Sequence, residues 1–107
     1  MKAPVLICPW LPATGMAIFP FILLKQLKLK QCPDLINHER IHLRQQLELL
    51  VLPFYVLYLI HYLVNRLRGQ PHQQAYRNIV FEREAFTMDK NLDYLSNRGF
   101  FAWIRFL

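Results

Sequence analysis

Five consecutive residues of the 107-residue chain combine histidine and glutamate at a spacing that favours metal chemistry. They read His38-Glu39-Arg40-Ile41-His42, an HExxH motif. In a helix, residues i and i+4 lie one turn apart on the same face, so His38 and His42 can both reach one ion. Glu39 is turned about 100° from His38, which places its carboxylate beside the ion as a general base for metal-activated water. The motif predicts a metal centre rather than two surface histidines on a charged helix.

A catalytic zinc ion takes three protein ligands and keeps a fourth position for water, so a third ligand is expected elsewhere in the chain. Glu82 lies in the segment FEREAF and shares one helical face with Ile79 and Phe86. Because these neighbours are apolar, we expect Glu82 to point inwards. A buried carboxylate is costly unless it is paired, and a divalent ion would pair it.

Two alternatives to this third ligand stay open. The first is that Glu84 is the ligand instead of Glu82. It is turned about 200° from Glu82 on the same helix, so only one of the two carboxylates can face the ion. Glu82 could instead form a salt bridge with a basic side chain, the candidates being Arg40, Arg44 and Arg77. We predict that His38, His42 and Glu82 are the metal ligands.

The combination of HExxH with E-x-x-A on a later helix resembles the gluzincin-type zinc metallopeptidases. His38-Glu39-x-x-His42 matches the first half of that pattern, and Glu82-x-x-Ala85 matches the second. The resemblance implies a zincin-like fold in which the two histidines and Glu82 bind Zn²⁺ and Glu39 is the catalytic base. The implied reaction is hydrolysis of a peptide bond in a peptide or protein substrate.

One position departs from the gluzincin pattern. Many gluzincins follow E-x-x-A or E-x-x-S with Asp or Asn, which supports a zinc-binding histidine, whereas this chain has Phe86 there. Asn78 or Asp89, which lie on the same helical stripe as Glu82, could take that role. The oxyanion stabiliser is also unassigned, although Tyr76 and Tyr94 flank the helix.

A longer stretch, roughly Gly15 to Leu95, is similar to a set of small bacterial HExxH proteins. The matching text is G-x-x-x-x-PF from Gly15 to Phe21, then NHERIHLRQQLELL, and later AYRN-x-x-FEREA. The HExxHxxQ form, with Gln45, is also similar to several metallopeptidase families. In zincins an edge strand beside the active helix binds peptide by strand addition, and Met16–Leu24 is a candidate for that strand.

The rest of the sequence predicts the elements that position these residues. We expect a mainly α (α+β) fold, a single zincin-like helical domain over residues 1–107 with a short N-terminal strand or hairpin. Pro53 should end the HExxH helix, since proline removes a backbone donor, and Gly69 should end the next helix. The expected elements are a strand or hairpin at 15–31, the HExxH helix at 34–52, an apolar helix at 54–68, the Glu82 helix at 72–90 and an aromatic segment at 92–107.

The apolar stretch Leu49–Asn65 contains 17 consecutive uncharged residues, which is at the lower limit for crossing a bilayer. Arginines flank it on both sides, so charge gives no orientation. We expect a buried helix that packs against residues 72–90 and covers Ile79 and Phe86. An interfacial helix and a true span are the alternatives, and any membrane contact should be peripheral.

The charge, cysteine and proline content of the chain bears on its partners and its location. Thirteen Lys and Arg against seven Asp and Glu give a formal charge of +6, but the arginines are dispersed, so we expect no nucleic-acid partner. Cys8 and Cys32 form no CxxC pair and should be reduced thiols. Three prolines interrupt the N-terminal apolar run, so we expect a protein that is not secreted and lies in the cytoplasm or on the cytoplasmic face of the membrane.

The sequence therefore supports two hypotheses. The first is a zinc-dependent metallopeptidase. The second is a module that keeps the HExxH helix but binds metal without turnover, or binds a membrane surface or a partner, since 107 residues leave little room for a substrate cleft.

Overall fold

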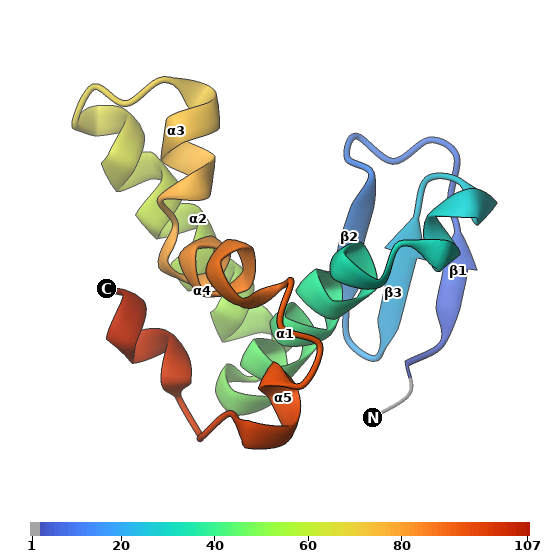
Figure 1. Ribbon diagram of the computed structural model, residues 1–107. Helices are drawn as coiled ribbons and strands as arrows, with labels where there is room; N and C mark the ends of the chain where they lie inside the picture. The colour runs from blue at the N-terminus through green and yellow to red at the C-terminus, as the bar shows by residue number, and fades with distance from the viewer. Residues whose placement is uncertain (1–2) are drawn as a thin grey trace.

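A small sheet and a group of helices lie on opposite sides of one central helix (Figure 1). The structure is a computed structural model and describes residues 3–107. The prediction of a mainly helical chain with a short N-terminal hairpin is confirmed. The strands are β1 (Val5–Ile7), β2 (Gly15–Ile18) and β3 (Phe21–Leu24); the helices are α1 (Pro33–Leu49), α2 (Val51–Leu67), α3 (His72–Arg77), α4 (Val80–Met88) and α5 (Tyr94–Asn97), with 3-10 turns η1 (Leu27–Gln31) and η2 (Ala102–Phe106).

The sheet has the order β1-β3-β2, with β1 parallel and β2 antiparallel to β3. A single strand over Met16–Leu24 was the wrong interpretation, because Phe19 and Pro20 form the turn between β2 and β3. Proline has no N–H for a ladder, so a turn suits Pro20 better than a strand. The strand or hairpin expected at 15–31 ends at Leu24, because η1 is helical, and β1 is an additional strand outside that range.

The boundary between α1 and α2 lies at Leu50, earlier than the predicted stop at Pro53. Leu50 has φ 65° and ψ 156°, a backbone conformation that glycine favours, and the helix axes bend by 110° there. Pro53 falls in the first turn of α2, where an N–H has no partner inside the helix and its absence costs little.

The predicted continuous helix at 72–90 is wrong, because the chain breaks between α3 and α4. Ile79 is extended, with φ −62° and ψ 133°. The next N–H, that of Val80, donates to Nδ1 of His61 on α2 at 3.0 Å instead of closing a helical turn. This hydrogen bond to another helix compensates for the break. The periodicity of residues 72–90 could not indicate it, because the acceptor lies outside that segment.

The central helix α1 separates one apolar cluster on its sheet side from two on its helical side. On its sheet side, Ala17, Ile22 and Leu24 pack with Leu43 of α1. On the helical side, Phe54 of α2 packs with Ile79, Val80 and Phe81 around the start of α4. Trp103 and Phe106 of η2 cover the same cluster. The HExxH residues of α1 therefore lie between the packed side chains of the sheet and those of the other helices.

The prediction that Leu49–Asn65 is a buried core helix is wrong for most of its surface. Phe54 covers Ile79 as expected, but Phe86 is covered by His38 and Tyr76 instead. Only Phe54 and Asn65 of α2 are buried, and most of its aliphatic side chains are exposed. Among the described residues no single helix is long and apolar enough to cross a membrane, and only the bent pair α1 and α2 reaches that length and composition together.

The strained backbone at Leu50 gives a stability prediction. Replacing Leu50, which is exposed, with glycine should raise the free energy of unfolding by about 1 kcal/mol, because relief of strain exceeds the entropy cost of glycine. Leu47→Gly is the matched control, since Leu47 is an exposed residue inside α1, and it should lower stability by about 1 kcal/mol. Urea denaturation measures both. Equal destabilisation by the two changes would contradict the positive φ at Leu50.

Candidate metal centre

Three buried side chains from two helices converge at one point. Nε2 of His38 and Nε2 of His42, both on α1, lie 3.0 Å and 3.1 Å from Oε1 of Glu82 on α4. One donor atom from each of the three residues lies within 4.8 Å of the others. Ligands 2.0–2.1 Å from a tetrahedral ion are separated by about 3.3 Å, so these spacings are close to those of a zinc site. This buried group could hold a metal ion.

Gln45 fixes the tautomer of His42. Its amide nitrogen donates to the carbonyl of Phe81 at 3.1 Å and to Oε1 of Glu84 at 2.9 Å, so its amide oxygen is the acceptor that faces Nδ1 of His42 at 2.8 Å. Nδ1 of His42 must therefore carry hydrogen, and Nε2 of the neutral ring presents its lone pair to Glu82.

Asp89 has the same effect on His38. Its carboxylate accepts from Nδ1 at 3.0 Å, the carboxylate–histidine contact that orients metal-binding imidazoles. With both Nδ1 atoms used as donors, two Nε2 lone pairs face an anionic oxygen. Either a proton on Nε2 or a cation must lie between them, so the group could also hold a metal ion. Of the two predicted support residues, Asp89 contacts His38, whereas Asn78 donates to Gln70.

The charges of the group are strongly coupled. Burial opposes ionisation of Glu82, but the charge of His42 and the hydrogen bonds from both imidazoles hold the pKa of Glu82 well below its usual range. Burial likewise opposes protonation of His42, yet the carboxylates of Glu82 and Glu39 and the contact with Gln45 raise the pKa of His42 to about 9. A metal ion bound at this point would replace protons, so its binding would depend on pH.

Glu39 lies beside the ligands without joining them. Its side chain is buried, and within residues 3–107 its carboxylate accepts no hydrogen bond. Burial raises the pKa of Glu39, and the charge of Glu82 adds to the rise, although His42 and His38 oppose it. A carboxyl group whose pKa is raised holds a proton more readily than an ordinary glutamate, which suits a group that must both accept and return a proton.

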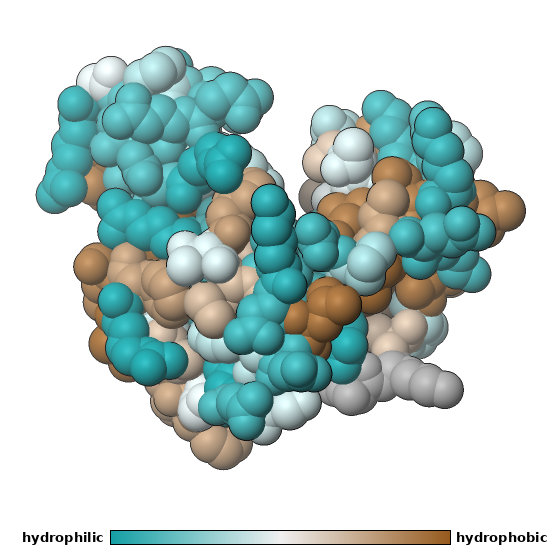
Figure 2. Space-filling model, in the orientation of Figure 1, coloured by the Kyte–Doolittle hydropathy of each residue, from teal (hydrophilic) through white to brown (hydrophobic). Residues whose placement is uncertain are grey.

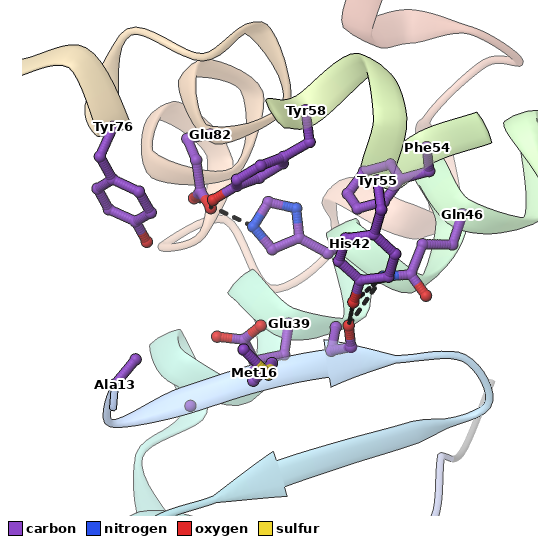
Figure 3. Close-up of a pocket in the computed structure, with 12 residues that line it drawn as sticks. Ala13, Met16, Glu39, His42, Gln46, Phe54, Tyr55, Tyr58, Tyr76 and Glu82 are labelled. Atoms are coloured by element: carbon purple, nitrogen blue, oxygen red, sulfur yellow. Dashed lines mark hydrogen bonds and ion pairs between the residues drawn. The ribbon is translucent and has the colours of Figure 1, made fainter. Parts of the chain in front are cut away.

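Glu39, His42 and Glu82 line a cavity of about 140 Å³ between the sheet and the helices. Figure 3 shows the phenols of Tyr58 and Tyr76 directed into this space, and Figure 2 shows the surface hollowed between the sheet side and the helical side. Tyr58 donates its hydroxyl hydrogen to Oε2 of Glu82. Burial, together with the charge of Glu82, raises the pKa of both phenols, so they stay protonated.

The sequence interpretation missed Tyr58 and assigned no role to Gln45. Tyr55, Tyr58 and Tyr62 recur at helical spacing on one side of α2, so a stripe of phenols in an apolar helix is the signal that could have found Tyr58. Tyr94, named together with Tyr76, lies outside the cavity and donates to Oε2 of Glu84 at 2.6 Å.

Glu84 belongs to a second buried cluster. The guanidinium of Arg98 donates to Glu84 of α4 and to Glu48 of α1, with a distance of 2.6 Å between Nη1 and Oε2 of Glu48. Burial opposes ionisation of Glu84, but hydrogen bonds from Arg98, Tyr94 and Gln45 outweigh it and lower the pKa of Glu84. Arg98 therefore ties together the two helices that carry the candidate ligands. No contact between Glu82 and Arg40, Arg44 or Arg77 occurs among the described salt bridges; Arg77 stacks on Phe86 instead.

Comparison of the chain with protein-family models, with curated proteins and with solved structures finds no match. Its function must therefore be argued from the geometry of the centre.

The Arg98 cluster gives a prediction about stability. Arg98→Met should lower the free energy of unfolding by about 3–5 kcal/mol, because it leaves two carboxylates buried without their cation. The double change Arg98→Met with Glu84→Gln should recover part of this loss. Arg105→Met, at an exposed arginine, is the matched control and should change stability by less than about 0.5 kcal/mol. Urea denaturation at pH 7 measures all three.

The same cluster sets a pH dependence. Since the pKa of Glu84 is lowered on folding, its contribution to stability is complete above the ordinary glutamate pKa of about 4.3 and declines as the pH falls below it. Arg98→Met should therefore lose less stability than wild type when the pH falls from about 5 to about 3. An equal loss in both proteins would place the acid-sensitive group elsewhere.

Proposed function

We propose that the protein is a zinc-dependent metallopeptidase with a zincin-like arrangement of its active helix and edge strand. The observation that carries the proposal is the convergence of His38, His42 and Glu82 beside the buried carboxylate of Glu39, in a cavity open to one strand edge. Two imidazoles and one carboxylate are the donor set of many catalytic zinc sites, which keep a fourth position open. When bound, zinc would polarise a substrate carbonyl and make water more acidic.

Glu39 would move the proton in this reaction. Its oxygens lie in the cavity beside the ligands, so it can take a proton from the attacking water and deliver it to the nitrogen of the leaving amine. A Cβ atom at Gly15 would lie only 3.1 Å from Oε2 of Glu39. The absence of a side chain at Gly15 therefore keeps space beside the reacting groups.

The phenols would stabilise charge on the substrate. Tyr58 donates to Glu82 and so holds that carboxylate in place. Figure 3 shows the hydroxyl of Tyr76 pointing into the cavity. Because the pKa of Tyr76 is raised by burial and by Glu82, this hydroxyl keeps its hydrogen and can donate to a developing oxyanion.

The sheet supports a peptide as substrate. In the order β1-β3-β2, the outer edge of β2 is not paired with another described strand and borders the cavity at Gly15, Met16 and Ala17. Gln46 and Tyr55 already donate to the carbonyl of Ala17, so an extended peptide would pair with the part of the edge near Gly15. Strand addition there would bring a peptide bond close to Glu39.

A second candidate function is metal binding without turnover. The three ligands already contact one another, and a cavity of about 140 Å³ holds only a small part of a peptide. The two functions differ in the role of Glu39, which has chemistry to perform only in the peptidase.

Metal content tests the ligands. Purified wild-type protein should hold one zinc ion per chain by mass spectrometry of the metal, because the donor set offers a single three-residue site. His42→Ala should weaken zinc binding at least about 100-fold. His72→Ala, at an exposed histidine that contacts Tyr62, is the control and should keep full zinc. Equal zinc in both variants, each folded by circular dichroism, would rule out the proposed ligands.

Proton transfer by Glu39 is tested separately. Glu39→Gln should keep zinc and lower peptide hydrolysis by about 10²–10⁴-fold, because a neutral amide cannot accept a proton from water. Asp34→Asn makes the same chemical change at an exposed residue of α1 and should retain activity. Cleavage of a mixed peptide library, read by mass spectrometry, is the measurement. Zinc binding with no cleavage in wild type would favour the non-catalytic function.

A further inference from the structure

The helix α2 carries an exposed aliphatic surface on the side turned away from the metal centre. We define this surface, the aliphatic face of α2, by its eight exposed side chains: Leu52, Val56, Leu57, Leu59, Ile60, Leu63, Val64 and Leu67. At 100° per residue these positions occupy one continuous arc about 160° wide. Figure 1 shows α3 and α4 beside α2, and the α2 side chains that pack in the cluster with them are aromatic ones outside this arc, such as Phe54 and Tyr58. Leu67 is 87% exposed.

The charges around this face have one sign. From Leu49 to Phe81 the chain contains no Asp or Glu. Arg66 and Arg68 are exposed, and on the same wheel each lies about 20° outside one border of the aliphatic arc. Neither forms an ion pair with another described residue. Long cationic side chains at both borders of an apolar face can extend into a layer of anionic groups while their stems cover apolar surface.

We propose that the aliphatic face of α2 docks on the surface of an anionic lipid bilayer, with α2 lying in the plane of the headgroups. A broad aliphatic arc bordered by arginines is the pattern of an interfacial helix, whereas a helix that pairs with a second copy needs only a narrow seam. The net charge of +6 adds attraction to anionic lipid. The proposal does not depend on metal chemistry.

The orientation that follows keeps the candidate metal centre accessible. Tyr58 lies about 180° from the middle of the aliphatic arc on the wheel of α2, and it lines the cavity. A helix that rests on lipid with its aliphatic face therefore turns the cavity towards the aqueous phase.

Vesicle flotation of the full-length purified protein is the test. Wild type should float with vesicles of phosphatidylcholine containing phosphatidylserine, and binding should fall in high salt and with phosphatidylcholine alone. Leu59→Gln with Leu63→Gln should weaken binding at least about tenfold, because each side chain loses the apolar contact with acyl chains. Leu6→Gln with Leu27→Gln is the apolar control, since both leucines are exposed on other elements, and it should bind as wild type does.

The arginines are tested in the same assay. Arg66→Gln with Arg68→Gln should weaken binding to anionic vesicles by about fivefold for each charge removed, and should leave binding to neutral vesicles unchanged. Lys28→Gln with Lys30→Gln removes the same charge from η1 and should have a much smaller effect. An equal effect of both pairs would show general charge attraction and overturn the proposed face.

Three further outcomes would overturn the proposal. One is failure of wild type to bind any vesicle. Another is a concentration-dependent dimer, seen by sedimentation, that the Leu59 and Leu63 changes abolish while the vesicle signal stays constant, since the face would then bind a second copy. The third is protein that resists carbonate extraction from membranes, because docking at the headgroups is reversible at high pH.

Discussion

A carboxylate buried against two imidazoles is the constraint on which the rest of the structure depends. Glu82 is 3% exposed, and an ionised group at that depth is stable only when charge and hydrogen bonds compensate it. His42 and His38 supply both charge and hydrogen bonds, and Tyr58 donates a further hydrogen bond. Since these partners come from α1, α2 and α4, the three helices have to meet at this point. The fold of the helical half follows from that requirement.

The central helix meets this requirement by dividing its polar residues between two faces. His42 and Gln45 face α4, while Glu39 and Gln46, seven residues apart, face β2. Gln46 accepts from the N–H of Phe19 at 2.7 Å and donates to the carbonyl of Ala17 at 2.9 Å, so it joins the hairpin to α1. The sheet is thereby fixed beside Glu39, whose carboxylate lines the cavity. Arg98 ties the end of α1, at Glu48, to the middle of α4, at Glu84.

The sequence was informative where spacing within one helix determines geometry and uninformative where distant residues do. HExxH and the inward stripe of Glu82 predicted the group that lies together, because i and i+4 residues share a face in any helix. The break at Ile79 could not be predicted, since a hydrogen bond to His61 on another helix compensates for it. The positive φ of Leu50 could not be predicted either, because leucine does not favour that conformation. Similarly, an apolar helix looks like core in a sequence, and only the tertiary structure shows which side is covered.

The rotation of α2 about its own axis explains why its aliphatic side is left uncovered. Turning that side inwards would break the contacts of Tyr58 with Glu82, of His61 with the N–H of Val80, and of Asn65 with the carbonyl of Ala75. Each lost buried hydrogen bond costs about 1–3 kcal/mol when its partner stays unsatisfied. The polar face is therefore held inwards by the centre and by the start of α4. The aliphatic side chains on the opposite face stay exposed in the part of the chain that the structure describes, so the polar contacts that build the candidate metal centre also determine which apolar surface of α2 is left uncovered.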